Sequence, residues 1–136
     1  MVTPTFIIEP LLIPNSVTYI GDFAFWNCYN LTNVNIQNAA TQIERFVFDN
    51  CNYLTVYCHI GIIPSRLSEY GYNYKCFGDF DNDKKLSSTD TVLMRKSLFG
   101  EYDENYDEKV ADMNQDSKFD IRDLVHLKKK LVGIMP

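Results

Sequence analysis

Two stretches in the second half of the chain show the hydrophobic spacing of amphipathic helices. In residues 87–99 and 120–132, apolar side chains recur every three or four positions, which is the period of one helix face. Each stretch is followed by a glycine, Gly100 or Gly133, the residue favoured immediately after a helix C-terminus. Neither helix can bury its apolar face alone, so we expect the two helices to pack on each other.

The first half of the chain has a longer period. Shifted by 23 residues, it aligns apolar residues with apolar residues, namely Ile8, Leu31 and Leu54; Leu11, Val34 and Tyr57; Ile20 and Ile43; Ala24 and Val47; Phe25 and Phe48; and Cys28 and Cys51. A period in the twenties is typical of a leucine-rich solenoid. We expect short strands near 11–13, 34–36 and 56–58, with turns of chain between them. A helix over 64–70 and a strand over 72–76 should cap the stack.

One segment of this half resembles a known repeat. Residues 13–28, Ile-Pro-Asn-Ser-Val-Thr-Tyr-Ile-Gly-Asp-Phe-Ala-Phe-Trp-Asn-Cys, are similar to the BspA-type leucine-rich repeat, and the resemblance covers about 5–76. That family occurs on bacterial surface and secreted proteins, which implies a recognition surface whose ligand the sequence does not name. Candidate recognition residues are Trp26, Tyr29, Tyr53 and Tyr57, although aromatic residues at repeat positions are more often core. Because fewer than three full repeats rarely hold a solenoid, we expect the chain to begin inside a longer array.

Two acidic segments of twelve residues begin 33 positions apart, at Asp79 and Asp112. Both place oxygen-bearing side chains at positions 1, 3, 5, 9 and 12, the spacing that wraps a Ca²⁺ ion. His and Cys are absent from both, which favours calcium over zinc or copper. The predicted ligands are Asp79, Asp81, Asp83, Ser87, Asp90 and the Lys85 carbonyl in the first loop, and Asp112, Asn114, Asp116, Asp120, Asp123 and the Lys118 carbonyl in the second.

Both loops depart from the usual EF-hand pattern. Position 6 is normally glycine, because the turn there favours a positive φ, but it is Lys84 in one loop and Ser117 in the other. Position 12 is aspartate, Asp90 or Asp123, which is one methylene shorter than the usual bidentate glutamate. We expect both departures to weaken calcium binding without abolishing it. Two bound ions would change the formal charge from −5 to about −1.

The duplication continues through the predicted helices. At the same offset the paired residues are Leu86 and Phe119, Val92 and Val125, Met94 and Leu127, Lys96 and Lys129, Leu98 and Leu131, and Gly100 and Gly133. No strong helix is expected ahead of the first loop, so the units lack the entering helix of an EF-hand. Two such units over about 77–134 resemble a type I-like dockerin, the module that anchors enzymes to cohesins in cellulosomes.

The dockerin resemblance implies a surface for a cohesin. The matching residues are Ser88, Thr89, Arg95 and Lys96 in the first half and Ile121, Arg122, Lys128 and Lys129 in the second. The two halves differ chemically, so we expect one dominant orientation, led by the second helix. Leu124 and Val125 are candidates for its apolar contacts, and basic residues there would speed encounter with an acidic partner.

Together these patterns predict an α+β multidomain chain: a short leucine-rich-repeat solenoid end with a cap, residues 1–76, and a small all-α dockerin of two EF-hand-like loop–helix units, residues 77–136. A very short connector around 77–78 should fix their relative orientation. The dockerin resemblance implies that the chain anchors a secreted, extracellular parent protein to a cohesin domain of a cellulosomal scaffoldin. The alternative is a surface or secreted adhesin whose repeats do the work and whose calcium module only stiffens the end.

Other classes of function fit the chain less well. An independent enzyme is disfavoured, because His59 and His126 have no evident nucleophile beside them and the acidic clusters are assigned to calcium. A calcium sensor is disfavoured because Met94 and Met113 are too few for an adaptable groove. The acidic charge argues against nucleic acid, and no signal peptide or apolar membrane span is visible.

The four cysteines form two groups. Cys28 and Cys51 share a repeat position and are expected to stack as small core residues on neighbouring turns. Cys58 and Cys76 are expected near each other on the last strands, and whether they form a disulfide stays open. No Cys-x-x-Cys spacing supports zinc or redox chemistry.

Overall fold

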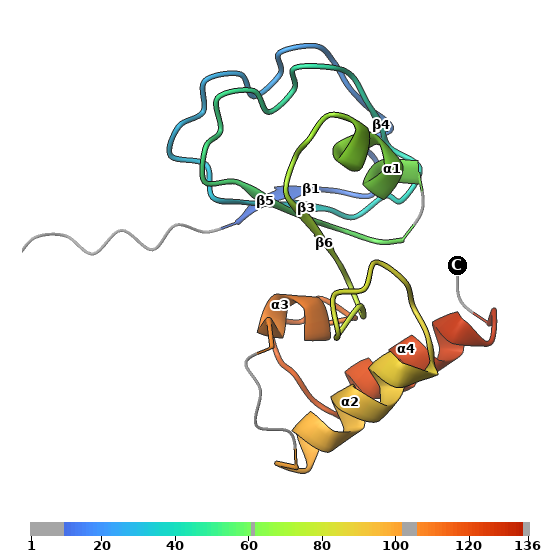
Figure 1. Cartoon of the computed structure of the whole chain (residues 1–136). Coiled ribbons are helices and arrows are strands. Elements are labelled where there is room, and N and C mark those ends of the chain that lie inside the picture. Colours follow the sequence, from blue (N-terminus) through green and yellow to red (C-terminus); the bar gives the residue numbers. More distant parts are fainter. Residues whose placement is uncertain (1–9, 61, 102–105, 135–136) are drawn as a thin grey trace, which may run out of the picture.

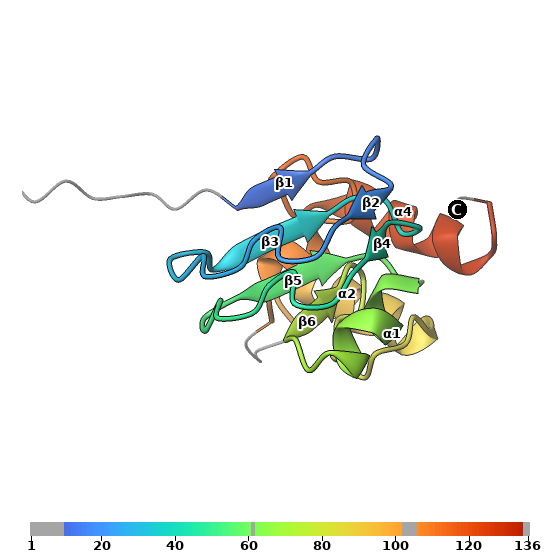
Figure 2. The same ribbon diagram turned by 90° about the horizontal axis from the view of Figure 1, so that it is seen from above.

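The structure is a computed structural model of the chain and describes residues 10–60, 62–101 and 106–134. The chain is α+β: short strands lie in its first half and its longest helices in its second. The main sheet is entirely parallel and contains, in spatial order, β1 (Leu11–Ile13), β3 (Asn33–Ile36), β5 (Thr55–Cys58) and β6 (Tyr74–Cys76) (Figure 2). The three predicted repeat strands and the capping strand are therefore confirmed to within two residues. Ile8, which was aligned with the repeats, lies outside the described residues.

The period of 23 is visible where β1 pairs with β3 and where β2 (Tyr19–Ile20) pairs in parallel with β4 (Gln42–Ile43), so that Leu11 lies beside Val34 and Ile20 beside Ile43. Between β3 and β5 the interval is 22, so Val34 lies beside Val56, and the predicted alignment of Val34 with Tyr57 is wrong by one residue. The sequence did not predict β2 and β4, because two residues are too short to show a period. The rings of Phe25 and Phe48 stack with centroids 5.5 Å apart. Four left-handed residues repeat at the same interval, Phe23 with Phe46 and Asn27 with Asn50.

A first core lies on one face of the main sheet. It contains apolar side chains that recur on successive turns, among them Ile13, Ile20, Val34, Ile36, Ile43, Phe48, Val56, Ile63, Leu67 and Cys76. The predicted capping helix is present as α1 (Ile62–Glu69), which buries Ile63 and Leu67 against this core. Successive side chains of a strand point to opposite faces of the sheet, so the strand residues that alternate with these core residues lie on the other face.

The second half contains α2 (Ser88–Leu98) and α4 (Ile121–Leu131), which lie side by side below the sheet (Figure 1). Each helix begins with a capping box, in which a residue at loop position 9 caps the helix and the aspartate at position 12 bonds back to it. Gly100 and Gly133 adopt positive φ after the helices, which confirms their predicted role as helix stops.

A short helix that the sequence analysis missed precedes the second loop. It is α3 (Glu108–Ala111), capped by the carboxylate of Asp107, which accepts from the Lys109 N–H. The expectation that both units lack an entering helix is therefore wrong for the second unit, which has a single turn. Asp107 followed by Glu108 is a helix N-terminal signal that could have been recognised.

A second core joins the helices to the loops. Its buried members are Tyr57, Phe77, Phe80, Met94, Val110, Ala111, Met113, Leu124 and Leu127. Met94 and Met113 are fully buried, so neither lines an exposed groove. Among the described residues, the helices are all too short or too polar to cross a bilayer.

The four cysteines are free thiols. Cys58 and Cys76 lie side by side on β5 and β6 and are buried, as expected for neighbours on the last strands. Cys28 and Cys51 are only partly buried, which corrects their assignment to the core interior. The Cys51 thiol lies 3.1 Å from the Phe25 carbonyl oxygen, so it packs at the margin of the first core.

Candidate metal sites and partner surface

The first acidic loop brings three carboxylates together. Oxygens of Asp79, Asp81 and Asp83 lie within 4.8 Å of one another. Asp79 is 3% exposed, and its two oxygens accept hydrogen bonds from the backbone N–H groups of Asp83 (3.1 Å) and Lys84 (2.9 Å). These bonds wrap the chain around the first carboxylate, as a twelve-residue calcium loop requires.

Asp90, at position 12, closes the first loop from inside α2. It is fully buried, and its oxygens accept from the backbone N–H groups of Phe80 and Ser87, each at 2.8 Å. The Ser87 hydroxyl caps α2 by accepting from the Thr89 N–H at 3.2 Å. The Lys85 N–H donates to Asp83 at 2.9 Å, and the group of three clustered carboxylates does not include Asp90.

The second loop repeats most of these hydrogen bonds, with a difference at position 12, where Asp123 accepts from the N–H group at position 3 and, within the described residues, not from the one at position 2. Asp112 accepts from the N–H groups of Asp116 (3.1 Å) and Ser117 (2.9 Å), as Asp79 does from Asp83 and Lys84. Asp123 is buried and accepts from the Asn114 and Asp120 N–H groups at 3.3 Å and 2.9 Å. The Lys118 N–H donates to Asp116 at 3.0 Å, matching Lys85 in the first loop.

The backbone of both loops passes twice through the left-handed region. The residues at position 4 are Asn82 (φ 58°) and Gln115 (φ 57°), and those at position 6 are Lys84 (φ 68°) and Ser117 (φ 67°). This confirms the positive φ expected at position 6. A residue with a side chain there costs roughly 1 kcal/mol relative to glycine.

Arg122 distinguishes the second loop from the first. Its guanidinium lies 2.6 Å from Asp120 and 3.0 Å from Asp116, whereas the equivalent residue in the first half is Thr89. Hydrogen bonds from Arg122 hold the pKa of Asp120 well below its usual value. Asp120 also caps α4 through the Arg122 N–H, so its carboxylate serves the helix start and the arginine together.

The electrostatics of both loops suit a hard cation. Burial raises the pKa of Asp79 to about 6, and it raises the pKa of Asp90 and of Asp112. Carboxylates that are buried together favour a proton or a metal ion that neutralises them. The donor set of carboxylate, amide and hydroxyl oxygens fits calcium in its chemistry and its order along the chain.

The predicted partner residues form two matching helix faces. Those on α2 are Ser88, Thr89, Arg95 and Lys96, and those on α4 are Ile121, Arg122, Val125, Lys128 and Lys129; all of these are exposed. Leu124 is only 3% exposed and belongs to the second core, so its prediction as a contact residue is corrected. Ile121, Arg122, Val125 and Lys129 line a shallow hollow of about 330 Å³ on α4.

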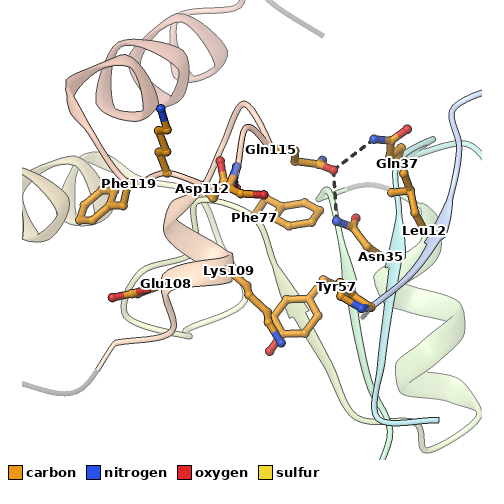
Figure 3. Close-up of a pocket in the computed structure, with 13 residues that line it drawn as sticks. Leu12, Asn35, Gln37, Tyr57, Phe77, Glu108, Lys109, Asp112, Gln115 and Phe119 are labelled. Carbon is orange, nitrogen blue, oxygen red and sulfur yellow. Dashed lines mark hydrogen bonds between the residues drawn. The ribbon is translucent and has the colours of Figure 1, made fainter. Parts of the chain in front are cut away.

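A further cleft lies between the main sheet and the second loop (Figure 3). It measures about 540 Å³ and is lined by Leu12, Asn35, Gln37, Gln115 and Lys109, among others. The buried Oδ1 atom of Asn35 has no hydrogen-bond partner within the described parts of the chain. Tyr57, a predicted recognition residue, is 6% exposed at the base of this region and donates its hydroxyl to Asp107, which corrects that prediction. Trp26, Tyr29 and Tyr53 are exposed.

Comparison with known proteins accounts for both halves. The model of the BspA type leucine rich repeat region matches residues 5–96, and the model of the dockerin type I domain matches residues 77–132. The two matches overlap over 77–96, a stretch that contains the first acidic loop and most of α2 in the structure. Both are non-catalytic modules. A type I dockerin is a calcium-dependent module that binds a cohesin.

A segment of 57 residues is 40% identical to part of a multidomain esterase from Ruminococcus flavefaciens. The segment is 42% of this chain but only 7% of the esterase, so the chain spans a small part of that relative. No solved structure matches the chain. The chain belongs to the BspA type leucine rich repeat family and carries a type I dockerin domain at residues 77–132.

Proposed function

We propose that the chain attaches a leucine-rich-repeat protein to a cohesin on an extracellular scaffoldin, through a dockerin that two calcium ions hold folded. Residues 1–76 form the end of the repeat solenoid and residues 77–136 the dockerin, built from two EF-hand-like loop–helix units. The observation that carries this proposal is the agreement of the two loops in hydrogen bonds, left-handed positions and helix caps.

Each loop would hold one ion through its carboxylates at positions 1, 3, 5 and 12, with Asn114 replacing a carboxylate in the second. Asp79 and Asp112 lie at the centre of the hydrogen bonds that shape their loops. Ser87 and Asp120, at position 9, are occupied as helix caps, which favours an indirect role through water for both. The bound cation would supply the positive charge that the buried carboxylates lack.

The cohesin would meet the exposed helix faces in one dominant orientation. Equivalent positions carry Ser88 on α2 but Ile121 on α4, and Ile121 is 55% exposed beside Val125. An apolar centre with basic residues around it is typical of a binding hot spot, whereas the α2 face is more polar. We therefore propose the α4 face, with Ile121, Arg122, Val125, Lys128 and Lys129, as the main contact.

The test is titration of a panel of type I cohesins against the full chain by calorimetry, with and without calcium. Asp79→Ala with Asp112→Ala should remove both calcium binding and cohesin binding. Asp22→Ala, an exposed aspartate in the repeats, is the matched control and should change neither. Undiminished cohesin binding in the double variant or in excess chelator would refute calcium-dependent docking.

Recognition by the repeats is a second candidate function, and one observation favours it. Phe23 and Phe46 are exposed and stacked with centroids 5.3 Å apart, and Trp26 meets Phe23 edge to face at 6.1 Å. Exposed aromatic clusters are often interaction surfaces. An adhesin of this kind, in which the calcium module only stiffens the end, predicts that no cohesin binds residues 77–134 tightly.

A further inference from the structure

One row of residues runs across the outward face of the main sheet, on the side opposite the first core. The strand registers place Leu12 beside Asn35, Asn35 beside Tyr57, and Tyr57 beside Lys75. All of these alternate with residues of the first core, so they share the other face. Asn35, Tyr57 and Lys75 each contact the helical half of the chain.

The second acidic loop touches this row through its position 4. The Gln115 side-chain oxygen accepts from the Asn35 amide at 3.1 Å and from the Gln37 amide at 3.2 Å, as Figure 3 shows. Gln115 is one of the left-handed residues and lies between two predicted ligands of the loop. Its backbone therefore cannot move without moving the loop that presents the carboxylates.

The first acidic loop is attached to the same sheet through its position 6. The Lys84 ammonium donates to the Tyr74 carbonyl oxygen at 2.8 Å and lies 4.4 Å from the centre of the Tyr74 ring. Tyr74 begins β6, an edge strand of the main sheet that ends three residues before the first loop. Glycine at this left-handed position would be less strained than lysine but would lack the contact that the Lys84 side chain makes.

Contacts outside the loops hold the two halves in the same arrangement. Asp107 accepts from the Tyr57 hydroxyl at 2.6 Å and from the Lys75 ammonium at 3.0 Å. At the other end of the interface, the Lys130 ammonium lies 3.1 Å from Nδ1 of His59. The outward row is therefore contacted by the second loop and by the start of α3, while the first loop is attached at the edge strand β6 and α4 at His59, just after β5.

We propose that the main sheet is a docking surface for the calcium-loaded loops of the same chain, with the outward row receiving the second loop and the edge strand β6 the first, and that Lys84 and Gln115 couple calcium binding to the stability of the repeats. The inference rests on the proposed calcium sites. An ion that fixes a loop also fixes the side chain tied to the sheet, so the contact is formed at a lower cost in entropy. Coupling of this kind is reciprocal, and the folded repeats should raise the calcium affinity of the loops.

The test uses the full chain and its one tryptophan, Trp26, which lies in the repeats and reports their unfolding. Urea unfolding is followed by Trp26 fluorescence with and without saturating calcium, while calorimetry measures calcium binding directly. In the unaltered chain, calcium should move the Trp26 transition to higher urea. In Lys84→Ser with Gln115→Asn that shift should be at least halved, although calcium still binds. Each replacement copies the residue found at the same position of the other loop, Ser117 or Asn82, where it has the same left-handed backbone.

Ser117→Gly is the matched control. It relieves the same left-handed strain at position 6 of the second loop, and the Ser117 side chain makes no hydrogen bond to the repeats in the described part of the chain. The control should keep the full calcium-induced shift. Calcium binding with no shift of the Trp26 transition, or a full shift in the double variant, would overturn the coupling alone. Absence of calcium binding to the unaltered chain would overturn the proposed function as well.

Discussion

Acidification from pH 7 to pH 5 should weaken the packing of the repeats on the helical half, because His59 is held neutral between them. Burial is the main cause that lowers the pKa of His59 from 6.5 to about 4, with further contributions from the Lys130 and His126 charges. The imidazole lies against the Phe77 ring, 4.9 Å between centroids, and its Nδ1 atom faces the Lys130 ammonium at 3.1 Å. A proton on His59 would place a second positive charge in that contact.

The magnitude follows from the difference in proton binding between the folded and unfolded chains. Because the folded pKa is the lower one, the stabilisation is fully present above about pH 6.5 and falls as the unfolded chain binds a proton. With pKa values of 6.5 and about 4, the loss between pH 7 and pH 5 is about 2 kcal/mol, and it reaches about 3 kcal/mol below pH 4.

The assay is urea unfolding at pH 7 and pH 5 in saturating calcium, comparing the unaltered chain with His59→Gln. Glutamine stays neutral at both values and can still accept from Lys130. The difference in unfolding free energy between the two proteins should therefore change by about 2 kcal/mol between the two pH values, in favour of the variant at pH 5. A difference that is the same at both pH values would refute a buried neutral His59. His126→Gln should show a smaller change, since the nearby Asp123 charge opposes the lowering of the His126 pKa.

Three further predictions test the interface, the connector and the second core. Burial raises the pKa of Asp107, but hydrogen bonds from Tyr57 and Lys75 outweigh burial and hold this pKa below its usual value. The stabilisation from the Asp107 carboxylate is therefore present above about pH 4 and is lost as the pH falls through the folded pKa. Asp107→Ala should lower the free energy of unfolding by about 1 to 3 kcal/mol at pH 7 in urea unfolding, and an unchanged midpoint would contradict the contact. Gly78→Ala should cost more than about 1 kcal/mol in thermal unfolding, because φ is 83° and the added Cβ would lie 2.7 Å from the Met113 sulfur, whereas Gly71→Ala carries the φ penalty without the clash and should cost less. Leu127→Ala should cost about 2 to 5 kcal/mol, and Leu131→Ala one turn later much less, since Leu127 is fully buried and Leu131 is not; equal costs would contradict the assignment of the core.

Local patterns in the sequence were enough to predict most of the secondary structure. The strand near 56–58 and the helices over 87–99 and 120–132 follow from spacing, because buried residues such as Val56, Met94 and Leu127 recur at the period of a strand repeat or of a helix face. The position of the two acidic loops could also be predicted, since the order of oxygen-bearing residues along the chain is the pattern expected of a calcium loop. The left-handed backbone at Lys84 and Ser117 follows from their loop position.

What the sequence could not give were contacts between segments far apart in the chain. Tyr57 aligns with Val34 at a shift of 23, yet the strand register places Val56 beside Val34 and turns Tyr57 to the opposite face, where its side chain belongs to the second core. Gln115 shows no local signal that it would bond to Asn35, a residue 80 positions away. Leu124 is buried although it is predicted as a contact residue, because a helical period gives the spacing of a buried stripe without its exact boundary.

The connector between β6 and the first loop consists of Phe77 and Gly78, and both backbone N–H groups are held by hydrogen bonds. The Phe77 N–H donates to the Cys58 carbonyl oxygen at 2.9 Å, and the Gly78 N–H donates to the Val110 carbonyl oxygen at 2.8 Å. A flexible tether of 20 residues would let its two ends separate by about 25 Å on average and in any direction. Because no such tether separates the two halves, a partner bound to the helices would also fix the orientation of the repeats. Copies of the chain bound side by side on one partner protein would then have their spacing and orientation set by that partner.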